Sequence, residues 1–169
     1  MAVRKRSRIY NADYSLAVQF ASRLPNLPSE VDFKRWMRAA LGQVAQVTIR
    51  VVNAAEARNL NSTFRDTNYP TNVLTFIYHA PGSSALQGDI VLCAPVVARE
   101  AREQKKMLAH HYAHLTVHGV LHLAGYDHEQ QADAEKMEAI EVAILASLGV
   151  PDPYSFDSSS RKGSQGRRQ

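Results

Sequence analysis

The stretch from His110 to His128 reads HHYAHLTVHGVLHLAGYDH and holds six of the seven histidines of the chain. Its apolar residues predict one helix from about Met107 to Ala124, which ends at Gly125, a residue suited to the turn after a helix. Three histidines of this helix follow one another at intervals of four: His114, His118 and His122. Residues at this spacing lie on one helix face, so the stretch predicts a stripe of imidazoles.

The spacing of His118, His122 and His128 is that of a metal site, H-x3-H-x2-G-x2-H. Gly125 lets the chain turn back, so that His128 approaches the helix histidines from another direction. Three neutral imidazoles suit zinc and leave a fourth position open for water or substrate. We therefore expect one zinc ion on these three residues. The alternative is a set of ordinary, hydrogen-bonded histidines on a partly buried helix.

The same skeleton occurs in the metzincin metalloproteases, whose motif is His-Glu-x-x-His-x-x-Gly-x-x-His. Gly119 stands where those enzymes carry the glutamate that activates the zinc-bound water. Its absence argues against peptide hydrolysis by that mechanism. A zinc hydrolase of peptide or amide bonds remains an alternative function. We also hypothesise that the missing side chain leaves room for a bulky phosphate near the metal.

Outward from this helix, strand patterns alternate with helix patterns. Strands are expected in Ile9–Phe20, Gln46–Val52, Val73–Tyr78 and Asp89–Cys93. Helices are expected after the N-cap Ser29 as far as Leu41, and over Ala54–Asn61, Val96–Lys106 and Gln131–Leu148. The last of these is expected to bury Met137, Ile140, Ile144 and Leu148. This order predicts an α+β fold, a single layered domain with a small mixed sheet packed against helices and the histidine-bearing helix at its centre, like a metzincin metal helix.

The composition suits one domain. The chain has 169 residues, of which 45% are hydrophobic and 21% charged, and its formal net charge is +4. We expect the domain to cover residues 1–157 and residues 158–169, SSSRKGSQGRRQ, to form a disordered basic tail. Such a tail either attracts phosphate backbones or only improves solubility.

Neither a membrane span nor a signal peptide is evident in the sequence. We therefore expect a cytoplasmic protein without a membrane partner. The single cysteine, Cys93, lies in an apolar stretch and is expected in the core. The cations of the helix before the histidines, Arg99, Arg102, Lys105 and Lys106, are expected on a solvated face, and His110 and His111 can be surface residues.

Three separated motifs resemble the YbeY family of metal-dependent bacterial endoribonucleases. They are HGVLHLAGYDH at His118–His128, LNSTFRDTNYPTNVLTF at Leu60–Phe76 and GDIVLC at Gly88–Cys93, and the likeness spans about Val47–Tyr154. The resemblance implies a zinc-dependent, single-strand-specific endoribonuclease that matures the 3′ end of small-subunit ribosomal RNA and takes part in ribosome quality control. It also implies the small ribosomal subunit, a ribosomal protein and an assembly GTPase as partners.

The resemblance also assigns residues. The family's metal ligands fall on His118, His122 and His128, and its catalytic positions fall on Arg65 and His114. A guanidinium suits this work because its rigid fork of donors matches a phosphate.

Two roles stay open. Either a zinc-bound hydroxide or His114 acts as the general base, or the 2′-hydroxyl of the RNA itself attacks the neighbouring phosphate. Asp127 either orients a histidine or forms a turn. A third function, besides the nuclease and the peptide hydrolase, is a non-catalytic ribosome-associated factor with structural zinc.

Overall fold

The structure is a computed structural model that describes residues 14–127 and 129–155. Residues 9–13 of the expected first strand, His128 and the expected tail at 158–169 lie outside the described residues.

Four strands form one mixed sheet in the order β1-β2-β4-β3. Their bounds are β1 Tyr14–Ala21, β2 Val44–Val52, β3 Val73–Ile77 and β4 Ala85–Cys93. β1, β2 and β4 run parallel, whereas β3 pairs with β4 in the antiparallel sense. β3 is therefore an edge strand, and its outer edge is available to neighbouring side chains.

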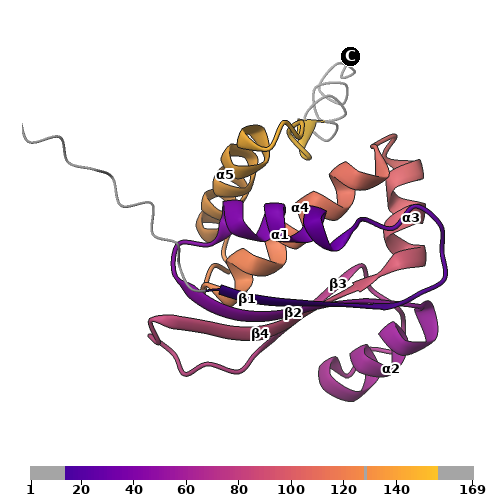
Figure 1. The fold of residues 1–169 in the computed structure, drawn as a ribbon, viewed down its shortest axis with the longest axis horizontal. Coiled ribbons are helices and arrows are strands. Elements are labelled where there is room, and N and C mark those ends of the chain that lie inside the picture. The colour runs from indigo at the N-terminus through magenta and orange to yellow at the C-terminus, as the bar shows by residue number, and fades with distance from the viewer. Residues whose placement is uncertain (1–13, 128, 156–169) are drawn as a thin grey trace, which may run out of the picture.

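Helices cover the sheet on both faces (Figure 1). Their bounds are α1 Glu30–Ala40, α2 Ala54–Arg65, α3 Ala94–Glu103, α4 Leu108–Leu123 and α5 Gln131–Ser147. Figure 1 shows α1, α4 and α5 over one face and α2 over the other, with α3 beside α4. This confirms the expected α+β fold with the histidine-bearing helix at its centre.

Helix α4 packs very closely on the sheet, and two glycines permit it. A Cβ added at Gly119 would lie 3.0 Å from Cγ2 of Ile90, and one at Gly88 would lie 2.6 Å from Cδ2 of Leu123. Ile90 and Leu123 are fully buried. The hypothesis that Gly119 leaves room for a phosphate is therefore wrong, because that space faces the core between α4 and β4.

Most expected elements are confirmed, and three of them differ by three or more residues at one end. β4 begins at Ala85, four residues before the expected Asp89. α1 begins with the capping box of Ser29 and Asp32, as its sequence favours. α2 continues beyond the expected end at Asn61 and closes at Asp66, which takes the left-handed conformation with φ 53°. α3 ends before the expected Lys106, because Lys105 also has a left-handed φ of 53°.

The burial expected for α5 needs correction. Met137 is buried as expected, but Ile140, Ile144 and Leu148 are only half-buried. The other fully buried residues of this helix are Glu141 and Leu145. A carboxylate thus occupies the centre of the stripe that faces α4. Among the described helices, none combines the length and apolar character that crossing a membrane requires.

Candidate metal centre

One pocket of about 470 Å³ lies at the outer edge of β3, between the end of α2 and the last turns of α4. Its lining residues are Arg65, Asn72, Val73, Leu74, Thr75, His118, His122, Asp127 and Glu129. The fold thus brings Arg65 from α2 together with His118 and His122 from α4. His128, the third expected ligand, lies outside the described residues.

The imidazoles of His118 and His122 face each other. Their Nε2 atoms are 3.0 Å apart and their ring centroids 4.5 Å apart. Because zinc–nitrogen bonds are 2.0–2.1 Å long, two ligands of one tetrahedral ion lie about 3.3 Å from each other. The two donor atoms are therefore already near the separation that a shared ion needs, and the residues fit a metal.

Behind His118 lies Glu141 of α5, which is 0% exposed. Its Oε1 is hydrogen-bonded to Nδ1 of His118, and its Oε2 lies 3.1 Å from Nε2 of His114 and accepts a bond from the hydroxyl of Tyr154. His114, His118 and Glu141 form a cluster of donor groups that can hold a metal ion. Tyr154, seven residues after the end of α5, thus contacts the same carboxylate as His114 and His118 of α4.

The carboxylate of Glu141 is held in its ionised form. Burial alone would raise the pKa of Glu141, but the hydrogen bonds of His114, His118 and Tyr154 together outweigh burial and keep this pKa well below its usual range. Burial and the adjacent carboxylate raise the pKa of Tyr154. The phenol therefore stays protonated and remains a donor to Glu141.

His114 is set back from the pocket. Both contacts of its Nε2, to Glu141 and to Tyr154, are 3.1 Å long, and its side chain is 13% exposed. Its Nδ1 is buried and has no hydrogen-bond partner among the described residues. The described residues that line the pocket do not include His114. Its partners are thus the buried carboxylate of Glu141 and the hydroxyl of Tyr154.

Arg65 is the last residue of α2. Its Nη2 donates a 2.5 Å hydrogen bond to the backbone oxygen of Thr75, and its Cζ lies 5.4 Å from the centre of the Phe76 ring. Phe64 packs edge-on against the same ring. These contacts tie an exposed arginine to the β3 edge, so the guanidinium stays at the rim of the pocket.

Two carboxylates also line the pocket, Asp127 and Glu129. Oδ1 of Asp127 accepts a 3.2 Å bond from the backbone N–H of Glu129. This bond is typical of a turn-forming aspartate, which is one of the two roles considered for Asp127.

Sequence reasoning missed Glu141 and Tyr154. The available signal for Glu141 was its spacing of four from both Met137 and Leu145, which places a carboxylate within an apolar stripe. A buried carboxylate needs partners, and the histidines of α4 were the natural candidates.

A second imidazole–carboxylate pair lies further towards the start of α4. Nε2 of His111 is 3.1 Å from Oε1 of Glu100, which also accepts a 2.9 Å bond from Asn72. His111 is only 3% exposed, so its surface placement is wrong. Burial lowers the pKa of His111 more than Glu100 raises it. This imidazole is therefore neutral near pH 7.

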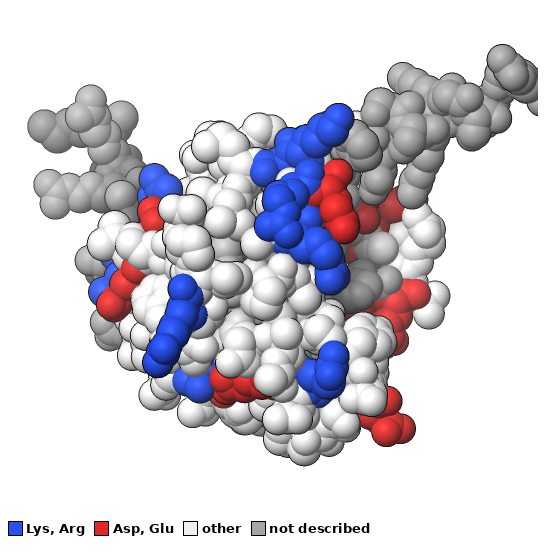
Figure 2. Space-filling model, turned by 90° about the vertical axis from the view of Figure 1, so that its right-hand side faces the viewer, with Lys and Arg blue, Asp and Glu red and all other residues white. Residues whose placement is uncertain are grey.

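The cations of α3 and the following turn gather on one face of the molecule (Figure 2). Arg99, Arg102 and Lys105 are exposed, as expected, and Arg99 lies 3.9 Å from Glu103. Lys106 differs, because its Nζ donates a 2.8 Å bond to the backbone oxygen of Pro153. Lys106 thus ties the turn before α4 to the segment that carries Tyr154.

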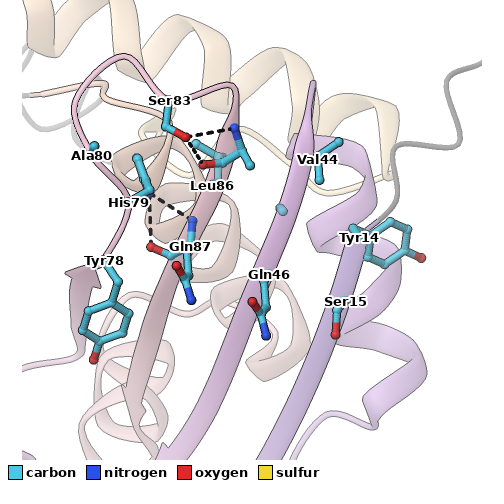
Figure 3. A pocket seen from close by; sticks show the side chains of 12 residues that line it. Tyr14, Ser15, Val44, Gln46, Tyr78, His79, Ala80, Ser83, Leu86 and Gln87 are labelled. Carbon is cyan, nitrogen blue, oxygen red and sulfur yellow. Dashed lines mark hydrogen bonds between the residues drawn. The ribbon is translucent and has the colours of Figure 1, made fainter.

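A larger hollow, of about 640 Å³, lies at the opposite end of the sheet (Figure 3). Ser15, Gln46 and Gln87 line it from three neighbouring strands. Nδ1 of His79 accepts a 3.0 Å bond from the backbone N–H of Gln87. The described lining of this hollow contains neither a carboxylate nor a lysine or arginine, whereas the β3-edge pocket combines carboxylates, an arginine and two imidazoles. Cys93 is free and buried, as expected.

Most of the chain matches one known protein family. The family model described as endoribonuclease YbeY matches residues 23–149. The endoribonuclease YbeY of Thiobacillus denitrificans is 58% identical over 139 residues, which cover 82% of this chain and 95% of that protein. The endoribonuclease YbeY of Methylobacillus flagellatus is 51% identical over 148 residues, 87% of this chain and 97% of the relative.

A solved structure supports the fold alone. The solution structure of TM1509 from Thermotoga maritima covers 91% of this chain and 100% of its own, with a TM-score of 0.54 and 23% identity. The sequence matches extend over most of the chain and include the pocket residues from α2, β3 and α4. This chain belongs to the endoribonuclease YbeY family.

Proposed function

We propose that this protein is a zinc-dependent endoribonuclease that cuts single-stranded RNA in the β3-edge pocket. The observation that carries the proposal is that Arg65 and the facing imidazoles of His118 and His122 line the same pocket. We assign one zinc ion to His118, His122 and His128. A zinc ion with an open position supplies a Lewis acid that polarises a phosphate oxygen.

Arg65 binds the scissile phosphate in this proposal. Its guanidinium is held at the pocket rim by Thr75 and Phe76, so its remaining donors can point to a phosphate without reorganisation. His114 contacts the buried carboxylate instead of lining the pocket, and we therefore assign it to the support of the centre. Attack by the RNA's own 2′-hydroxyl requires no protein group at the position of Gly119.

Exposed aromatic side chains near Arg65 favour single-stranded RNA. Phe64 and Tyr69 are 59% and 61% exposed, respectively. Unpaired bases stack on such rings, whereas bases within a duplex are already stacked. The α3 cations add non-specific attraction to phosphates.

The family and the names of its members support RNA as the substrate. Within this class we propose the 3′ precursor of small-subunit ribosomal RNA, with roles in its maturation and in ribosome quality control. The partners would be the small ribosomal subunit, a ribosomal protein and an assembly GTPase, in the cytoplasm.

One observation keeps a second function in view. Asp127 and Glu129 bring carboxylates into the pocket lining. A carboxylate beside a zinc ion is what peptide hydrolysis requires. A peptide substrate therefore belongs in the same test.

The test is cleavage of a labelled single-stranded RNA that carries the small-subunit 3′ precursor, by zinc-loaded protein. Arg65→Ala should slow cleavage by about 10² to 10³, because a donor that stabilises the developing charge is lost. Arg58→Ala is the matched control, since Arg58 is an exposed arginine of the same helix and does not line the pocket.

Equal cleavage by the wild type and both variants would point to a contaminating nuclease and overturn the proposal. Cleavage of a peptide panel, with RNA left intact, would establish the second function instead.

A further inference from the structure

We propose that Glu141 and Tyr154 are positioning residues of the metal centre. Glu141 holds the ring of His118 so that Nε2 is directed into the pocket, and Tyr154 holds Glu141 in place. This inference rests on the proposed function, because it takes His118 as a metal ligand.

The two nitrogens of His118 have different neighbours. Nδ1 is hydrogen-bonded to Glu141, whereas Nε2 lies 3.0 Å from Nε2 of His122. A carboxylate accepts hydrogen bonds but does not donate them, so the proton of a neutral His118 ring belongs on Nδ1. Nε2 then carries the lone pair that a metal ion requires. The carboxylate thus selects the tautomer and the orientation of this ligand.

Glu141 needs more than one partner because it is completely buried. Oε1 serves His118, while Oε2 serves His114 and the hydroxyl of Tyr154. The carboxylate is therefore held from both oxygens and cannot turn away from His118. His114, with its Nε2 directed at the same carboxylate, belongs to this support.

Tyr154 reaches the carboxylate because its own segment is anchored. The backbone N–H of Tyr154 donates a 2.8 Å bond to Oδ1 of Asp152. The preceding residue, Pro153, is buried and its carbonyl accepts the 2.8 Å bond from Lys106. The segment after α5 is thus attached to the turn before α4. This attachment fixes the backbone that places the Tyr154 hydroxyl beside Glu141.

The rival arrangement makes Glu141 itself a ligand, together with His114 and His118. Two features favour the positioning role. A direct hydrogen bond joins Oε1 to Nδ1 of His118, so this ring nitrogen is already engaged by the carboxylate. The described lining of the pocket includes His118, His122 and Arg65, but neither Glu141 nor His114.

The experiment compares the full-length wild type with Glu141→Gln, Tyr154→Phe and the control Glu100→Gln. Glu100 is the matched carboxylate, because it pairs with a buried histidine of the same helix that does not line the pocket. Zinc affinity is measured by competition with a chromophoric chelator. Nitrogen-15 spectra of the metal-free proteins report which nitrogen of each imidazole carries the proton, and circular dichroism confirms folding.

Glu141→Gln should raise the zinc Kd about 10- to 100-fold, as loss of a carboxylate behind a histidine ligand typically does. Tyr154→Phe, which removes only one hydroxyl, should raise it roughly fivefold. Glu100→Gln should bind zinc like the wild type. The metal-free wild type should show the His118 proton on Nδ1.

Wild-type zinc affinity in both Glu141→Gln and Tyr154→Phe would overturn the inference, as would equal weakening in Glu100→Gln. A change of coordination number in the absorption spectrum of cobalt-loaded Glu141→Gln would make Glu141 a ligand, which also overturns the inference. If the wild type binds no zinc, the proposed function fails. In that case the nitrogen-15 spectra of the metal-free proteins still test whether Glu141 keeps the His118 proton on Nδ1.

Discussion

Two imidazole–carboxylate pairs on α4 share the same chemistry but differ in what the second ring nitrogen meets. In the pair of His111 and Glu100, Nδ1 of the histidine is buried and has no partner among the described residues. In the pair of His118 and Glu141, the second nitrogen faces His122 in a pocket. A histidine–carboxylate pair therefore does not mark a site by itself. What distinguishes the two pairs is the ring nitrogen that does not contact the carboxylate. In a structural pair this nitrogen is buried, whereas in a metal site it points into a pocket where it can bind an ion.

The largest difference is expected when each imidazole is removed. His118→Ala should reduce RNA cleavage by on the order of 10³ or more, since a metal centre contributes several kcal/mol of charge stabilisation. His111→Ala should leave the rate per folded molecule unchanged and lower the free energy of unfolding by about 1–3 kcal/mol, because Glu100 loses a buried partner. Single-turnover cleavage and urea unfolding measure the two effects. Similar losses of cleavage in both variants would contradict the view that only the pair of His118 and Glu141 belongs to the metal centre.

Zinc should stabilise only proteins with an intact His118. At a free zinc concentration 100 times the Kd, the free energy of unfolding should rise by about 2.7 kcal/mol. His111→Ala should keep this gain and His118→Ala should lose it. Urea unfolding in chelator-buffered zinc makes the comparison. A gain that survives in His118→Ala would place the ion elsewhere.

The smallest effect concerns acid stability. Burial lowers the pKa of His111 below 6.5, helped by His114 and Lys106 and opposed by Glu100. The unfolded chain then binds this proton more readily than the folded protein. The contribution of His111 is thus complete above pH 6.5 and is lost as the pH falls towards the lowered pKa, by at most about 1.4 kcal/mol per pH unit. Urea unfolding over roughly pH 5 to 7 should show a shallower dependence in His111→Gln. If the free energy of unfolding depends on pH in the same way in the wild type and in His111→Gln, the lowered pKa of His111 does not contribute to acid sensitivity.

The sequence predicted the elements whose signals are local. The four-residue histidine spacing and Gly125, which has a φ of 97°, were sufficient for α4 and its end. The end of α2 was not predictable in this way, because Asn61, Ser62 and Thr63 are weak helix formers. Contacts distant in sequence extend this helix: Asn61 is buried and its side chain donates to the backbone oxygen of Tyr69, while Phe64 packs on Phe76.

The candidate site was predicted as far as its motif extends. The fold brings Arg65, His118 and His122 to one pocket, and the assignment of His128 stays a prediction. Glu141 was missed because a glutamate on an amphipathic helix normally faces water. Only its partners on α4 and the returning Tyr154 bury it, and neither contact is visible in the sequence of α5.

The segment that ends at Tyr154 has a consequence for biosynthesis. Translation delivers Arg65, His118 and His122 first, and Glu141 and Tyr154 only afterwards. A nascent chain therefore carries the imidazole of His118 before it carries the carboxylate and the phenol that we propose to orient it. An RNA-cutting enzyme built in this order acquires an organised centre only late in its own synthesis. A chain interrupted before Glu141 lacks that organisation while it is still attached to the ribosome.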